Sequence, residues 1–169
     1  YTLGIPNREV EKGLFEIIIP KFTTITTDEL GLSIENFRQS FIHADIEKLM
    51  NLLKAALADI PTILKKNQCE NYYETVTHVI FRQTGFSVVS EFQSIAGRSD
   101  IVVTTKDSVF IFELKMDKGR AFEEVAAEAL EQIDAGGYAD RFAESGKQMY
   151  KVGVVFSSDG KGMCGWKVK

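Results

Sequence analysis

The hydrophobic positions of the chain change their period at Gly85. Before this residue, apolar side chains recur three and four positions apart, which is the spacing of one face of an α-helix. After it, short apolar stretches rich in Val, Ile and Phe are separated by turns, a pattern typical of β-strands. The sequence therefore predicts a helical N-terminal part followed by a part that mixes strands and helices.

The N-terminal part predicts three helices. Asn7 is expected to cap the first, the polar and β-branched residues 23–27 predict a connector, and the second helix is expected to begin after Ser33. Asp45 is expected to cap the third helix, whose apolar stripe continues to Ile60. Because a helix with one apolar face needs a packing partner, we expect these helices to pack on each other and on the C-terminal part.

The C-terminal part predicts one more helix and then a mixture of elements. The helix is expected over 67–84 and ends at Gly85. The following elements are strands over 86–92, 101–105, 109–115, 151–156 and 163–168, with a helix over 121–134 before the last two strands. This order predicts an α/β fold with a central mixed sheet flanked by helices. We divide the chain into a helical extension, 1–66, and a core, 67–169.

The strand 109–115 carries the candidate chemistry. Side chains alternate along a strand, so Glu113 and Lys115 share a face. The tight turn at 106–108 joins this strand to its predecessor in an antiparallel hairpin, which brings Asp100 to the same end of the sheet. We therefore expect Asp100 and Glu113 to converge, with Lys115 beside them.

Two converging carboxylates and a lysine have a definite chemical use. Asp100 and Glu113 supply the hard oxygen ligands that Mg²⁺ or Mn²⁺ prefers, and such an ion activates water and polarises a phosphoryl oxygen. Lys115 could orient the water or stabilise developing charge. Arg98, Lys118 and Arg120 flank the acids and could contact phosphate, or they could be solvated loop charges. The alternative for Glu113 and Lys115 is a solvated ion pair, worth about 0–1 kcal/mol.

The residues of this hairpin also form a recognisable pair of motifs. The motifs are Gly97-Arg98-Ser99-Asp100 and Phe112-Glu113-Leu114-Lys115. Their arrangement resembles the PD-(D/E)XK nuclease superfamily, with Ser99 in place of the usual proline. More narrowly, the chain is similar to nuclease-like domains at the C-terminus of bacterial proteins with an AAA-ATPase-like domain upstream. The segment 4–10 resembles the start of such a module, and the resemblance implies a restriction-endonuclease-like core.

The resemblance implies further site residues. Asp100 and Glu113 match the metal-binding acids, and Lys115 matches the motif lysine. Glu70 matches an extra metal-binding acid from the first core helix, although Glu74, one turn later, remains an alternative.

A glutamine on the later helix completes the pattern that the resemblance implies. Gln132 matches a catalytic glutamine in a Gln-x5-Tyr pattern, in which Tyr138 and the flanking Arg98 would contact substrate. Gly136-Gly137 stands where a lysine-containing ending is more usual, so the direction of Tyr138 stays open.

Composition limits the possible classes of function. The net charge of −4 gives no general basic field of the kind that marks tight, non-specific nucleic-acid binders. Cys69 and Cys164 are far apart and lack CxxC spacing, which excludes a Cys-rich zinc site and a disulfide framework. No apolar run reaches the roughly 20 residues of a membrane span, and no signal peptide is visible, so a cytoplasmic location without membrane association is expected. The start at Tyr1 without Met suggests an excised module.

These observations favour a Mg²⁺- or Mn²⁺-dependent nuclease acting on DNA or RNA, with water activated at Asp100 and Glu113 and assisted by Lys115. The first alternative is a catalytically weak, nuclease-like binding module that serves an upstream ATPase-like domain. The second is an interaction domain whose helices 1–66 bind a partner. A homodimer is an expectation by analogy with nucleases that cut two strands.

Overall fold

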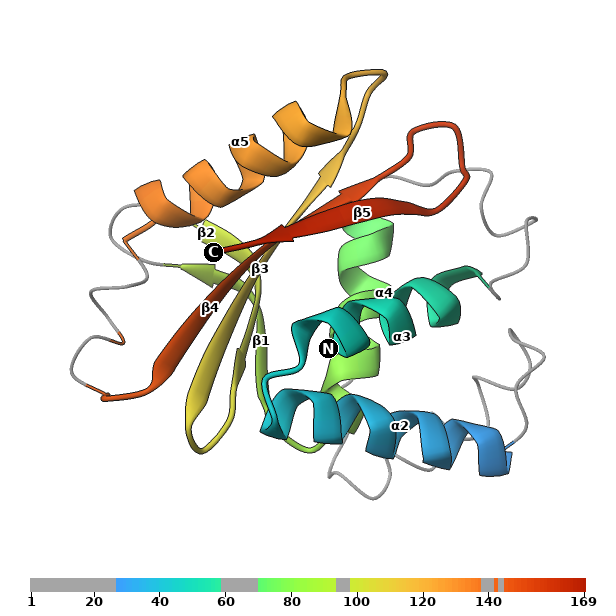
Figure 1. Ribbon diagram of the computed structural model, residues 1–169, viewed down its shortest axis with the longest axis vertical. Helices are drawn as coiled ribbons and strands as arrows, with labels where there is room; N and C mark the ends of the chain where they lie inside the picture. The colour runs from blue at the N-terminus through green and yellow to red at the C-terminus, as the bar shows by residue number, and fades with distance from the viewer. Residues whose placement is uncertain (1–26, 59–69, 94–97, 138–141, 143–144) are drawn as a thin grey trace, which may run out of the picture.

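A five-stranded mixed sheet organises the molecule (Figure 1). The structure, a computed structural model, describes residues 27–58, 70–93, 98–137, 142 and 145–169. The strands, in their order across the sheet, are β1 Ser87–Gln93, β2 Arg98–Thr104, β3 Ser108–Met116, β4 Gln148–Phe156 and β5 Met163–Val168. Only β3 and β4 run parallel, and the other neighbours are antiparallel. The predicted mixed sheet, its β2–β3 hairpin and the central place of β3 are confirmed.

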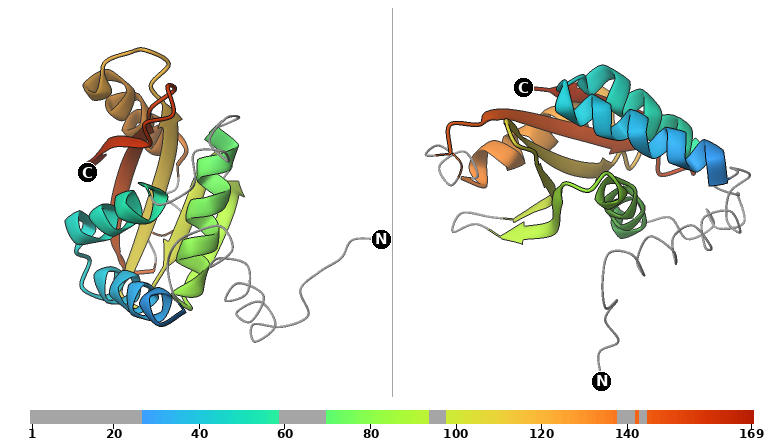
Figure 2. Two further views of the ribbon diagram at one scale, coloured as in Figure 1. Left: turned by 90° about the vertical axis from the view of Figure 1, so that its right-hand side faces the viewer. Right: turned by 90° about the horizontal axis from the view of Figure 1, so that it is seen from below.

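Helices cover both faces of the sheet (Figures 1 and 2). The helices are α2 Thr27–Ile42, α3 Ile46–Ala58, α4 Glu70–Gln83 and α5 Phe122–Ala135. The first three share a core with the even-numbered residues of β3, whereas α5 packs over the odd-numbered residues of β3. The predicted α/β architecture with flanking helices is confirmed. No helix among these residues is long and apolar enough to cross a membrane.

The N-terminal helices follow the sequence pattern with one correction. Asp45 caps α3, where its Oδ1 accepts a hydrogen bond of 3.0 Å from the backbone N–H of Lys48. The predicted start of the second helix after Ser33 is wrong, because α2 already begins at Thr27, inside the predicted connector. One glycine inside a helix costs only about 1 kcal/mol, so Gly31 does not stop it. The predicted first helix with Asn7, and the end of the α3 stripe, lie outside the described residues.

Two strand boundaries also differ from the prediction. The sequence placed Arg98 in a loop, but Arg98 pairs with Gln93 of β1, so β2 begins there. The start of β4 is Gln148 and not residue 151, because Gln148 pairs with Ser108 of β3. In both cases the backbone ladder continues through polar residues, since the ladder uses main-chain groups and not side chains. Asp100 therefore lies inside β2 and not at its start.

Aromatic side chains join the N-terminal helices to the sheet. Phe41 of α2 is fully buried, and the centre of its ring lies 5.0 Å from that of Phe81 on α4 and 5.1 Å from that of Phe110 on β3. Both contacts are edge-to-face, a favourable arrangement for aromatic rings. The expected packing of these helices on the C-terminal part is confirmed, while the division at residue 66 stays a prediction.

Close packing of α5 on the sheet depends on Gly153. A Cβ atom added at Gly153 would lie 2.9 Å from the backbone oxygen of Ala126 and 3.0 Å from Cβ of Ala129, both on α5. Gly153→Ala is therefore expected to lower the free energy of unfolding by about 1–3 kcal/mol, because the helix must move away. Urea unfolding measures the change.

Gly165→Ala on β5 is the matched control for this substitution. Its added Cβ would lie 3.0 Å from the ring of Phe122, a side chain that can rotate away. Its expected loss of stability is therefore smaller. If both substitutions lowered the free energy of unfolding equally, the rigid backbone of α5 would not be what limits the space at Gly153.

Candidate active site

The hairpin of β2 and β3 brings Asp100 beside Glu113. Ile101 pairs with Phe112, and one further step along the antiparallel register places Asp100 opposite Glu113. The carboxylate of Asp100 accepts a hydrogen bond of 2.7 Å at Oδ2 from the backbone N–H of Leu114. The side chain of Asp100 therefore lies against the short segment that carries Glu113 and Lys115.

Glu113 and Lys115 form an ion pair that is largely removed from water. Nζ of Lys115 lies 3.1 Å from Oε1 of Glu113, and the two side chains are 15% and 1% exposed. Their shared face, expected from strand alternation, is confirmed by this contact. The pair is not the solvated surface pair of the alternative interpretation, because a charge as buried as that of Glu113 needs a partner or an ion.

Helix α5 supplies a third side chain. Oε1 of Gln132 accepts a hydrogen bond of 2.5 Å from Nζ of Lys115. Lys115 is therefore held from two sides, by a carboxylate on its own strand and by an amide on the helix above it. The three side chains define one end of the sheet face that α5 covers.

The apolar sequence of β3 explains this placement. Val109 and Ile111 are buried against Ile133 of α5, so the next residues on the same face, Glu113 and Lys115, continue this row toward the end of the strand. Gly153 pairs with Glu113 on the neighbouring strand and lets α5 come close. The helix then lies near enough for its glutamine to reach the lysine.

The structure places the start of α4 at the same end of the sheet, on the opposite face. Tyr73, in the first turn of α4, stacks on Phe156 with ring centres 4.0 Å apart. Phe156 pairs with Met116, the residue after Lys115. The backbone of Glu70 begins α4 at this end, and its side chain lies outside the described part of the chain.

The two predicted substrate contacts stay predictions. The backbone of Arg98 begins β2, two residues before Asp100, but its side chain is not described. Tyr138 lies outside the described residues. His78 of α4 is partly buried and shares a hydrogen bond with the hydroxyl of Ser90 on β1.

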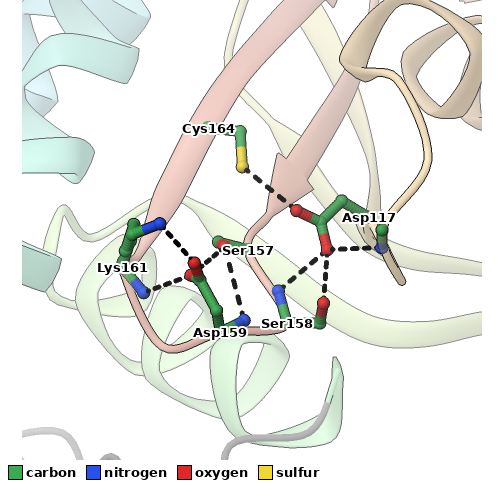
Figure 3. Close-up of polar contacts among 7 residues, drawn as sticks. Asp117, Ser157, Ser158, Asp159, Lys161 and Cys164 are labelled. Carbon is green, nitrogen blue, oxygen red and sulfur yellow. Dashed lines mark hydrogen bonds and ion pairs between the residues drawn. The ribbon is translucent and has the colours of Figure 1, made fainter.

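Asp117 is a structural feature of this end of the sheet that the sequence did not single out. Its Oδ1 accepts hydrogen bonds from Ser158, of 2.9 Å from the backbone N–H and 2.6 Å from the hydroxyl (Figure 3). The hydroxyl and then the backbone of Ser158 lower the pKa of Asp117 below its usual value. An Asp-x-Gly turn signal at Asp117-Lys118-Gly119 was present in the sequence, but its partner, 41 positions away, was not visible there.

The chemistry of the donor set fits a hard divalent cation. Among the described residues, no group of three or more His, Cys, Asp or Glu side chains could hold a metal ion. The pair Asp100 and Glu113 remains, placed by the antiparallel register and by the hydrogen bond to Leu114. Mg²⁺ is usually bound by one or two carboxylates and keeps several waters, so this oxygen pair fits it.

Comparison with known proteins relates most of the chain to a nuclease superfamily and all of it to a longer bacterial protein. The family model described as PD-(D/E)XK nuclease superfamily matches residues 68–166. An Azotobacter chroococcum mcd 1 protein, described as an uncharacterized protein in the vnfD 5′ region, is 28% identical over 173 residues. That match covers all of this chain and 33% of the Azotobacter protein, so the chain spans about a third of the length of this relative.

Proposed function

The chain belongs to the PD-(D/E)XK nuclease superfamily, and from this premise we propose that it is a metal-dependent nuclease that hydrolyses phosphodiester bonds in DNA or RNA. The proposal rests on one observation. The side chain of Asp100 lies against the segment of β3 that carries the buried Glu113–Lys115 ion pair. Two acids can hold a metal ion that activates water and polarises a phosphoryl oxygen, and a nearby lysine can stabilise the charge that develops.

Each side chain has a role in the proposed mechanism. Asp100 and Glu113 would hold Mg²⁺ or Mn²⁺, with Glu70 as a further candidate ligand from α4. When bound, such an ion lowers the pKa of a coordinated water and polarises a phosphoryl oxygen. Lys115 directs its ammonium group toward the reacting phosphate and stabilises the charge that develops there. Gln132 keeps the lysine in place through its 2.5 Å hydrogen bond.

A second candidate is a catalytically weak, nuclease-like binding module that serves an upstream ATPase-like domain. One observation favours it: the net charge of −4 gives no general basic field for a nucleic acid. Under either proposal the partner is nucleic acid in the cytoplasm. A homodimer would give such a nuclease two sites for two strands.

Asp100→Asn tests the proposed function. We expect the wild-type protein to cleave DNA or RNA with Mg²⁺ or Mn²⁺, and the variant to be slower by about a hundredfold or more, because one metal ligand is lost. Cleavage of single- and double-stranded DNA and RNA substrates measures activity, and calorimetric titration with Mn²⁺ measures binding without reference to activity. Asp107→Asn, in the turn at the other end of the hairpin, is the matched control and should behave as wild type.

Two results would decide against the nuclease. If Mn²⁺ neither binds nor stabilises the wild-type fold, and no substrate is cleaved, the metal-dependent mechanism is excluded. Retained oligonucleotide binding in that case would favour the binding module.

A further inference from the structure

The loop after β3 contains a strained turn next to the candidate active site. The N–H of Arg120 donates a hydrogen bond of 2.9 Å to the backbone oxygen of Asp117, closing a four-residue turn. Its two central residues both have positive φ, 49° at Lys118 and 78° at Gly119. This is the backbone of a type I′ turn, which glycine adopts without steric cost and which is disfavoured for lysine because of its Cβ atom. A side chain held in this region needs support from its surroundings.

Asp117 provides that support. Its Oδ1 accepts a hydrogen bond of 3.3 Å from the N–H of Gly119 in addition to the two from Ser158 (Figure 3). Its own N–H donates to the backbone oxygen of Phe156 at 2.8 Å, which extends the β3–β4 ladder by one step. The turn is thus fixed to the end of β4 and to the loop between β4 and β5.

The two cations of the turn differ in their partners. Nη1 of Arg120 lies 2.7 Å from Glu128 and 3.7 Å from Glu124, so this guanidinium is already engaged. Lys118 is exposed, and no ion pair within the described residues involves it. Of the two, Lys118 is the charge that remains available to a ligand.

Lys118 also follows Lys115 closely along the chain, in the turn directly after β3. The pKa of Glu128 is lowered chiefly by the hydrogen bond from Arg120, and the positive charges of Lys115 and Lys118 lower it further. The exposed turn lysine is three residues from the proposed catalytic lysine, just beyond the end of β3.

We propose that Lys118 binds a backbone phosphate of the nucleic acid beside the one that is cleaved, and that Asp117 is a positioning residue that presents Lys118 for this contact. The inference rests on the proposed function. A backbone held in a disfavoured conformation, an ammonium group with no described ion-pair partner and a location three residues from Lys115 together carry it. Phosphate contacts of this kind fix the position of a nucleic acid without reading its sequence.

Lys118→Gly separates binding from stability. Glycine adopts positive φ without strain, so the melting temperature should stay equal or rise, whereas a structural lysine would lower it on removal. Loss of one phosphate contact should raise KM about tenfold at low salt and reduce the slope of log affinity against log salt by about one, with kcat little changed. Lys118→Arg should keep the salt slope. Lys106→Ala, in the turn at the far end of the hairpin, is the control.

Ser158→Ala tests the positioning role of Asp117. The substitution removes one hydrogen bond to the carboxylate, so KM should rise by a smaller factor of about three in the otherwise wild-type chain. In the Lys118→Gly background it should cause no further rise in KM, because the presented charge is already gone. If Ser158→Ala raised KM by the same factor in the wild-type and Lys118→Gly backgrounds, the positioning role of Asp117 would be overturned.

Binding and cleavage of a fluorescein-labelled oligonucleotide, as single strand and as duplex, distinguish the possible failures. If wild type cleaves and Lys118→Gly shows the wild-type KM and salt slope, this inference fails and the nuclease proposal stands. If wild type neither binds nor cleaves, both fail together.

Discussion

Glu113→Gln is expected to remove both divalent-metal binding and cleavage, whereas Lys115→Met is expected to remove cleavage alone. Glutamine keeps the shape of Glu113 but loses the charge that a cation requires, so the rate should fall about a thousandfold, equivalent to about 4 kcal/mol. Methionine keeps the length of Lys115 but removes the ammonium group that, in the proposed mechanism, would stabilise the charge on the phosphate. Mn²⁺ should then bind as tightly as in wild type or more tightly, because no ammonium competes for Glu113.

The second part of this prediction concerns the stability of the Lys115→Met variant in the absence of metal. In Lys115→Met the buried Glu113 loses the ammonium group 3.1 Å away that balances its charge. Breaking a buried pair in this way typically costs about 3 kcal/mol or more, so the metal-free variant should unfold at lower urea concentration. Saturating Mn²⁺ should restore much of that stability, since an ion that binds only the folded state stabilises it.

Calorimetric titration, single-turnover cleavage and urea unfolding together measure these effects. Glu113→Gln with wild-type cleavage would remove Glu113 from the mechanism. Lys115→Met that fails to bind Mn²⁺ would show that the lysine shapes the metal site, and not only the chemistry.

Phe41→Ala is expected to lower the free energy of unfolding by about 4 kcal/mol, the cost typical of removing a buried aromatic ring. Phe41 is 0% exposed and contacts rings on both α4 and β3. Other apolar side chains of α2 and α3 remain in the core that these helices share with the sheet, so the variant should still unfold in one cooperative step. Circular dichroism and tryptophan fluorescence should report the same midpoint.

Ile42→Ala is the control, because the neighbouring Ile42 is 46% exposed and its loss should cost less than about 1 kcal/mol. A separate early transition of α2 and α3 in Phe41→Ala would instead show that these helices form an independent unit. That result would support a division of the chain at residue 66, whereas a single transition would place the helices within one cooperative domain.

Local pattern was sufficient for much of the fold. The cap at Asp45 and the buried stripe of α3 follow from helical spacing, and both were predicted. The hairpin follows from a turn too short for any other connection. The errors concern element boundaries: α2 begins before Ser33, and β2 begins at Arg98. In both cases packing or backbone pairing continues through residues whose polar side chains suggest the end of the element.

The sequence by itself determined that Glu113 and Lys115 share a face and that Asp100 comes to their end of the sheet. Strand alternation and a tight turn depend only on residues close together in the sequence, so the sequence alone predicts them. Only the tertiary structure decided three other features. These are the burial of Glu113, the hydrogen bond between Lys115 and Gln132, and the hydrogen bond between Ser158 and Asp117. These contacts join residues up to 41 positions apart, and they exist because sheet register and the close approach of α5 bring distant segments together.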